Sequence, residues 1–195
     1  MFALGLTGSI ATGKSTALKV FADLGIPVFS ADDAVHALYR GAAVAPIAAL
    51  FPGVAKNGEI DRAALSRQLV ADPTQLKALE KIVHPLVRAQ IDAFLEDARQ
   101  RGVPLAVVDI PLLYERNIDW GFDAVLVTTV DSAEQARRAL ARPGMSVDKL
   151  HAILARQMPQ SEKIARADYV LDTAQPTAAN RAALEALVAK LTGRS

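Results

Sequence analysis

The chain contains no cysteine among its 195 residues. This excludes a disulfide framework, thiolate chemistry and any zinc site built on cysteine, and it fits the reducing cytoplasm, where we expect the protein to be located. The sequence also lacks an excess of either charge, because 22 basic and 21 acidic residues leave a formal net charge of +1. We therefore expect no nucleic-acid partner and no disordered acidic tail.

No apolar run reaches the length of a membrane span, so we expect no association with a membrane. The first residues carry no basic region ahead of their apolar stretch, and we expect no signal peptide. Internal repeats and low-complexity segments are also absent. A chain of 195 residues can build one full α/β core with an insertion, but not two large domains.

Residues 8–15 contain the pattern G-x-x-x-x-G-K-S, which is typical of a phosphate-binding P-loop. An apolar strand is predicted before it, over residues 2–7, and a helix after it, from Lys14 to about Ala22. Gly8 and Gly13 let the backbone curl so that successive N–H groups point at one anion, and the helix N-terminus adds its dipole. A glycine-rich turn that binds nothing is the alternative. The residues predicted to bind the nucleotide are Gly8, Ser9, Ile10, Ala11, Thr12, Gly13, Lys14, Ser15 and Thr16.

Two side chains of the motif have distinct chemistry. Lys14 supplies a mobile positive charge for the β- and γ-phosphates of a nucleotide such as ATP. Ser15 offers a hydroxyl to Mg²⁺, which binds few protein groups and keeps several waters.

A second strand, predicted over residues 26–29, runs directly into Asp32 and Asp33. In open parallel sheets, ligands bind beyond the carboxyl ends of the strands, where these carboxylates and the P-loop would both lie. One of them could orient a substrate hydroxyl and approach the metal. The alternative is an N-cap for a helix beginning at Ala34, and two adjacent aspartates permit both roles.

Residues 31–102 then interrupt the alternation of strands and helices. Asp61 predicts the N-cap of a helix through Leu69, and a further helical pattern follows Asp72-Pro73. The His84-Pro85 pair predicts a break or kink before a long amphipathic helix that stops at Gly102. We interpret this region as a helical insertion, a natural place for the acceptor substrate.

The remaining strands are predicted over residues 104–110, 122–130 and 168–171, with a closing helix over 176–191. Asp109, near the end of its strand, is either a Walker-B-like partner of the Mg²⁺ shell or a buried aspartate bound to the P-loop. A helix capped at Asp131-Ser132 carries Arg138 and leads to Arg142, and Ser146 caps the next helix, predicted to run to about Gln157. These arginines indicate either a mobile lid that closes over phosphates or a solvated helix face.

Several of these stretches together resemble the dephospho-CoA kinase family. The resemblance spans nearly the whole chain, and its most specific parts are the His-Pro pair and the turn over residues 111–115. The matching stretches are residues 6–16, Ala31-Asp32, 79–85, 109–115, Arg138 with Arg142, Gln157 and 167–170.

The resemblance implies an α/β fold of the nucleoside-monophosphate-kinase type, with a five-stranded parallel sheet flanked by helices. It implies a nucleotide-binding core over 1–30 and 103–195, a lid over about 138–150, and a helical substrate-binding insertion over 31–102. The implied reaction moves the ATP γ-phosphoryl group, with Mg²⁺, to the ribose 3′-hydroxyl of dephospho-CoA, giving CoA and ADP in the last step of coenzyme A synthesis. The implied protein is a monomer or a weak homo-oligomer.

The resemblance also assigns roles to residues of this chain. It implies that Asp32 is the catalytic aspartate and that Lys14, Arg138 and Arg142 assist the transfer, with Ser15 on the metal side. The residues that it implies for acceptor binding are Asp32, His84, Pro111, Leu112, Tyr114 and Glu115.

The chain departs from the family pattern at four places. Ser30 replaces the first aspartate of the Asp-Ala-Asp segment, which leaves Asp32 as the retained acid. Ala11 stands where glycine is usual in the loop, Pro143 replaces a common acidic residue, and Thr173 stands where asparagine is typical.

Two other functions are compatible with the P-loop. One is a different small-molecule kinase of the same fold, such as a nucleoside monophosphate or shikimate kinase, which acceptor screening would separate. The other is a nucleotide-dependent regulatory switch. A GTPase of that kind would show an Asn-Lys-x-Asp segment for base recognition, and the sequence contains none.

Overall fold

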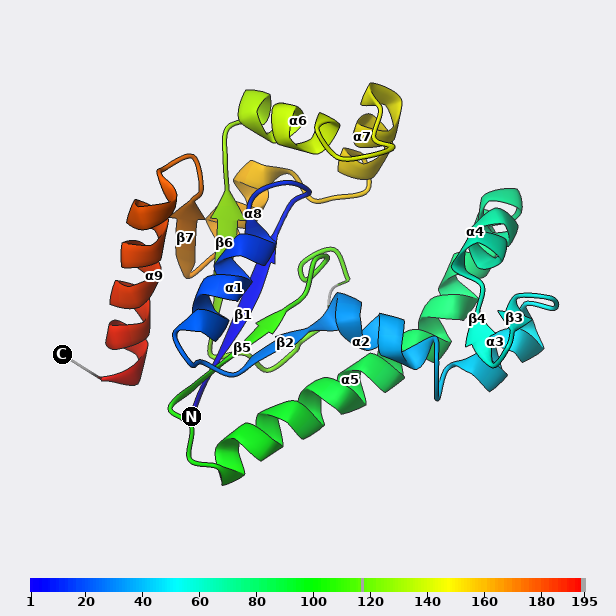
Figure 1. Cartoon of the computed structure of the whole chain (residues 1–195), viewed down its shortest axis with the longest axis horizontal. Helices are drawn as coiled ribbons and strands as arrows, with labels where there is room; N and C mark the ends of the chain where they lie inside the picture. The colour runs from blue at the N-terminus through cyan, green and yellow to red at the C-terminus, as the bar shows by residue number, and fades with distance from the viewer. Residues whose placement is uncertain (117, 194–195) are drawn as a thin grey trace. The chain divides into compact units, whose positions relative to one another are not determined.

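The computed structural model describes residues 1–116 and 118–193, and the chain folds into two compact units (Figure 1). The first comprises Met1–Phe29 and Asp97–Ser195, and the second Ser30–Glu96. The elements in and at the edges of the first unit are β1 (Phe2–Gly8), α1 (Lys14–Asp23), β2 (Val28–Ser30), β5 (Leu105–Asp109), β6 (Ala124–Thr129), α6 (Ser132–Leu140), α7 (Val147–Leu154), α8 (Gln160–Arg166), β7 (Tyr169–Asp172) and α9 (Thr177–Thr192). The others are α2 (Ala31–Leu38), α3 (Val44–Leu50), β3 (Ala55–Lys56), β4 (Glu59–Ile60), α4 (Arg62–Ala71), a 3-10 turn (Pro73–Gln75) and α5 (Leu76–Gln100).

The first unit is built on a five-stranded sheet with the strand order β2-β5-β1-β6-β7. Strand β1 is central and pairs in parallel with β5 and β6, with Leu6 opposite both Asp109 and Leu126. Leu4 and Leu6 are fully buried, as expected for a parallel strand covered on both faces. The predicted five-stranded parallel sheet is therefore confirmed. Its register brings the carboxyl ends of β1, β5 and β6 to one edge, where the P-loop begins.

The core of this unit lies between the sheet and two helices. Helices α1 and α9 contact each other, and both contact β5. Phe21 of α1 and Leu184 of α9 are buried in one cluster with Leu4 of β1, Val107 of β5 and Leu126 of β6. Burying a large apolar side chain contributes about 1.5–3 kcal/mol, so this cluster fixes the strand–loop–helix segment that carries the P-loop.

The second unit has a separate core and a short hairpin. Ile47 of α3 is fully buried, together with Phe51 and Val54, which follow that helix. The two residues at the tip of the β3–β4 hairpin, Asn57 and Gly58, have φ angles of 51° and 81°. An Asn-Gly pair with two positive φ angles is the preferred two-residue hairpin turn, and this hairpin was not predicted.

Of the break or kink expected at His84-Pro85, the break is wrong, because α5 continues through Pro85 as one helix. A kink there stays a prediction. Proline inside a helix costs about 3 kcal/mol. The apolar stripe of Leu79, Val83, Val87 and Ile91 is buried on both sides of the proline, and each of these side chains contributes about 1.5–3 kcal/mol on burial. Burial of the stripe therefore outweighs the local cost.

The helix after the second strand begins earlier than predicted, at Ala31 rather than Ala34. Its N-cap is Ser30, whose hydroxyl accepts a hydrogen bond from the N–H of Asp33 at 3.2 Å. The predicted capping role for the aspartates is therefore wrong, since both lie in the first helical turn. A negative charge at that place interacts favourably with the helix dipole.

The last third of the chain follows the predicted order with one addition. The N-caps Asp131 and Ser146 are confirmed, but α7 ends at Leu154 rather than near Gln157, and the separate helix α8 was not predicted. Among the described residues, no helix is both long and apolar enough to cross a lipid bilayer.

Candidate active site

The P-loop lies between β1 and α1, and its two motif glycines are required for different reasons. A Cβ atom on Gly8 would collide with the hydroxyls of Thr128 and Thr12. Gly13 has a φ of +85°, and a Cβ there would lie 2.9 Å from the side chain of Thr173. Close approach therefore selects glycine at the first position, and backbone conformation together with crowding selects it at the second.

Ala11, at the position where the resemblance predicts glycine, adopts a left-handed backbone with a φ of 62°. That conformation costs a non-glycine residue about 1–2 kcal/mol. The methyl group is buried against Ala139 of α6 and Leu150 of α7, and burial of one such group contributes about 0.8 kcal/mol. The alanine thus offsets part of its backbone strain by packing the loop against these helices.

Lys14 and Asp109 form an ion pair beneath the loop. The ammonium group of Lys14 lies 2.5 Å and 2.6 Å from the two carboxylate oxygens of Asp109, and the side chains are only 14% and 6% exposed. This structure therefore shows Asp109 as a buried aspartate bound to the P-loop, and its role beside Mg²⁺ stays a prediction. The pair keeps the lysine charge at the sheet edge where phosphates would bind.

The oxygen donors near this pair fit a magnesium ion. Ser15 is exposed in the first turn of α1, and Asp109 ends the adjacent strand. Among the described residues, no group of three or more His, Cys, Asp or Glu side chains could form a metal cage. Mg²⁺ does not need one, because it is commonly held by one or two protein oxygens together with substrate phosphates and water.

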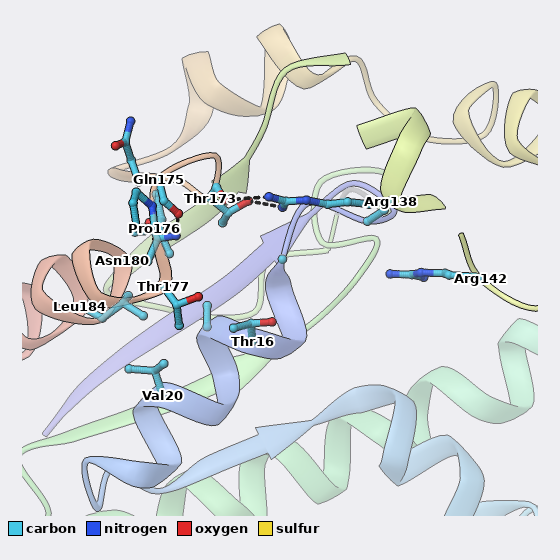
Figure 2. Close-up of a pocket in the computed structure, with 14 residues that line it drawn as sticks. Thr16, Val20, Arg138, Arg142, Thr173, Gln175, Pro176, Thr177, Asn180 and Leu184 are labelled. Carbon is cyan, nitrogen blue, oxygen red and sulfur yellow. Dashed lines mark hydrogen bonds between the residues drawn. The ribbon is translucent and has the colours of Figure 1, made fainter. Parts of the chain in front are cut away.

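A cavity of about 400 Å³ opens beside the P-loop (Figure 2). Its apolar wall includes Val20 of α1 and Leu184 of α9, and its polar rim includes Arg138, Arg142 and Asn180. An apolar slot with a few polar groups at its edge suits a planar base and its sugar.

Arg138 reaches across this cavity to Thr173, as Figure 2 shows. Its guanidinium donates to the hydroxyl and to the carbonyl oxygen of Thr173, both at 2.9 Å, and to Glu134 at 2.7 Å. The side chain of Arg142 is exposed and also lines the cavity. The structure thus brings both predicted arginines to the P-loop cavity.

Two glutamines, Gln135 and Gln157, hold the P-loop through Ile10. The sequence did not predict either of them as a site residue. The amide oxygen of Gln157 accepts from the N–H of Ile10 at 3.0 Å, and the side-chain amide of Gln135 donates to the Ile10 carbonyl at 2.8 Å. Gln157 was noted only as part of the family resemblance. A polar side chain on the buried face of α6 was the signal for Gln135.

The turn over residues 111–115 is fixed by hydrogen bonds and an ion pair. Glu115 lies 2.8 Å from the ammonium group of Lys163, which is fully buried, and also accepts from the N–H of Met158. The hydroxyl of Tyr114 donates to the carbonyl of Arg166. These contacts give the turn a structural role, and acceptor binding by Glu115 and Tyr114 stays a prediction.

Two further residues of the turn were expected to bind the acceptor. The carbonyl of Pro111 accepts from the hydroxyl of Thr7 at 3.2 Å, and Leu112 is half-buried. His84 is half-buried on α5 in the second unit. The roles of these three in acceptor binding also stay predictions.

Asp32 lies in the second unit, in the first turn of α2, with its side chain exposed. It lines a groove of about 460 Å³ whose other walls come from α4 and the start of α5. Because Ser30 caps the helix, the Asp32 carboxylate is not needed for capping and can meet a ligand in this groove.

A P-loop at the edge of a five-stranded parallel sheet, with two arginines in the lining of the cavity beside it, is typical of P-loop kinases. Shikimate kinase from Bacteroides thetaiotaomicron shares this fold, with a TM-score of 0.56 at 14% identity over 96% of this chain and 98% of that one. The family model described as dephospho-CoA kinase matches residues 2–178. The chain belongs to the dephospho-CoA kinase family, whose members phosphorylate dephospho-CoA to CoA in the last step of coenzyme A biosynthesis.

Individual relatives agree with this assignment. The dephospho-CoA kinase of Rhizobium meliloti is 51% identical over 96% of this chain and 97% of its own length. That of Mesorhizobium japonicum is 48% identical over 100% and 98%. The solved dephospho-CoA kinase of Campylobacter jejuni has a TM-score of 0.73 at 25% identity, covering 98% and 97% of the two chains.

Proposed function

We propose that this chain transfers the γ-phosphoryl group of ATP to the ribose 3′-hydroxyl of dephospho-CoA, giving CoA and ADP in the cytoplasm. The observation that carries the proposal is the P-loop of a chain that matches the dephospho-CoA kinase model over residues 2–178. The kinase family implies ATP as the phosphoryl donor.

The chain's own residues act mainly by position and charge, because phosphoryl transfer has a loose transition state that needs little covalent help. When ATP binds, Lys14 leaves its ion pair with Asp109 and contacts the β- and γ-phosphates instead. Arg138 and Arg142 face the same phosphates from the other side of the loop and neutralise the charge that spreads over the transferred group. The base of the nucleotide occupies the apolar cavity beside α1 and α9.

Asp32 orients the acceptor hydroxyl and accepts its proton late in the transfer. An exposed carboxylate in a groove, with its capping role taken by Ser30, supports this assignment. Ser15, with Asp109, would hold Mg²⁺, which would offset the negative charge of the phosphates. The predicted helical insertion over residues 31–102 binds the rest of the acceptor.

The test is ADP release from ATP and Mg²⁺, measured with and without dephospho-CoA, with the product identified by mass. We expect a large acceptor-dependent rate and a product with the mass of CoA. ADP release that ignores dephospho-CoA would contradict the proposed acceptor, and an acceptor screen that includes shikimate and nucleoside monophosphates would then identify the substrate.

A further inference from the structure

The groove beside Asp32 has a cationic end. Asp32 and Tyr39 line it from the two ends of α2, and Arg62, the first residue of α4, lines it from the facing helix. Tyr39 follows Asp32 by seven residues, which at about 1.5 Å per residue places the two about 10 Å apart along the helix. The groove therefore carries a carboxylate at one end and a guanidinium near the other.

Arg62 lines the groove together with Tyr39. Burial raises the pKa of the Tyr39 hydroxyl, and the charge of Arg62 opposes part of that rise. The backbone fixes this corner of the groove, because the N–H of Ile60 donates to the Tyr39 carbonyl at 2.8 Å. The backbone just before α4 is thus held at the C-terminal end of α2, and Arg62 follows Ile60 by two residues.

Among the described residues, no ion pair neutralises the charge of Arg62. Neighbouring cations are paired, Arg40 with Glu59 and Lys56 with Asp61. Across the described ranges 1–116 and 118–193, no acidic side chain forms an ion pair with Arg62. A positive side chain in the first turn of a helix also opposes the helix dipole, so its place is not explained by helix stability.

The helix N-terminus itself is not the anion site. The first free N–H groups of α4, on Ala63 and Ala64, donate to the carboxylate of Asp61 at 3.0 Å. Any anion in this part of the groove would therefore be held by the Arg62 side chain.

The spacing matches the acceptor of the proposed reaction. From the 3′ oxygen of a ribose, the second phosphorus of a 5′-diphosphate is seven bonds away. Bonds of about 1.5 Å that meet near the tetrahedral angle advance about 1.25 Å each, so the extended span is about 9 Å. A ribose hydroxyl at Asp32 therefore allows the diphosphate to reach the far end of the groove. Guanidinium groups bind phosphate oxygens in pairs, with planar geometry.

We propose that Arg62 binds the 5′-diphosphate of the acceptor and so selects nucleotides that carry one, an inference that rests on the proposed function. Buried Leu65 and Leu79 line the same groove and offer an apolar surface to the parts of the acceptor next to the diphosphate.

The test compares steady-state kinetics of the parent, Arg62→Gln, Arg62→Lys and Arg67→Ala, with ATP and dephospho-CoA varied separately. Loss of a charge-assisted phosphate contact should raise the KM for dephospho-CoA roughly 10- to 100-fold in Arg62→Gln. The KM for ATP and the kcat should change less than about threefold. Arg62→Lys should recover part of the loss, because an ammonium keeps the charge but not the paired geometry. Arg67, exposed on the same helix and outside the groove lining, is the matched control.

The kinetic results distinguish the role of Arg62 from the proposed function. An unchanged KM for dephospho-CoA in Arg62→Gln, or a fall in kcat with KM unchanged, would overturn the role of Arg62 while leaving the proposed function intact. A parent protein that makes no CoA would instead overturn the proposed function. Circular dichroism and thermal unfolding of each variant separate loss of binding from loss of folding, and Arg62→Lys keeps the test valid if Arg62→Gln unfolds.

Discussion

Thr173 links the arginine of the proposed lid to the P-loop. Its hydroxyl and carbonyl oxygens both accept from Arg138 at 2.9 Å. The hydroxyl oxygen lies 3.0 Å from the Thr12 carbonyl oxygen and 3.1 Å from that of Thr129, so the hydroxyl can donate to either. Thr173 therefore sets the direction of the Arg138 guanidinium beside the P-loop.

The first prediction concerns this link. Thr173→Val keeps the shape of the side chain but removes the hydroxyl, so we expect the free energy of unfolding to fall by about 1–3 kcal/mol and kcat/KM for ATP to fall with it. Thr173→Ser keeps the hydroxyl and should retain most of both. Urea unfolding and steady-state kinetics measure the two effects, and a valine variant equal to the parent in both would show that the link has no importance.

Substitutions at the ion pair of Lys14 and Asp109 can separate an effect on stability from an effect on catalysis. Lys14→Met should abolish activity, and it should also lower stability by about 3 kcal/mol, because it removes one partner of a nearly buried pair. Adding Asp109→Asn should restore much of the stability without restoring activity. Thermal unfolding and ADP release test both parts. Activity in either variant near that of the parent would contradict the role of Lys14.

Asp32 and Asp33 provide a matched pair of carboxylates in one helical turn. Asp32→Asn should lower kcat about 100- to 10,000-fold, the usual range for loss of a general base, with the KM for ATP nearly unchanged. Asp33→Asn should stay close to the parent, since it makes the same charge change one residue away. Equal losses in the two variants would indicate an effect on the helix rather than on the chemistry.

Glu134 holds Arg138 over a wide pH range. Hydrogen bonds from Arg137, and then from Arg138, lower the pKa of the Glu134 carboxyl to about 2. A lowered carboxyl pKa favours the folded state above the ordinary value near 4.5, and this contribution is lost as the pH falls toward 2. Carbon-13 NMR titration should show the low value in the parent and a larger rise for Arg137→Ala than for Arg138→Ala. A Glu134 carboxyl that titrates near 4.5 in the parent would contradict the contact.

The sequence by itself determined the local features of the fold. The P-loop, its flanking strand and helix, the parallel strands and the caps at Asp61, Asp131 and Ser146 are all encoded in short stretches of chain. Such features depend on local backbone preferences, so pattern and spacing are enough to predict them.

Only the tertiary structure decided which polar side chains meet. The pairing of Lys14 with Asp109 joins residues 95 positions apart, and that of Arg138 with Thr173 joins residues 35 apart. The same is true of Pro85, where burial of the stripe on α5 overrides the local signal, and of Arg62, which has no motif of its own. Contacts of this kind depend on strand order and helix packing, and sequence spacing does not contain that information.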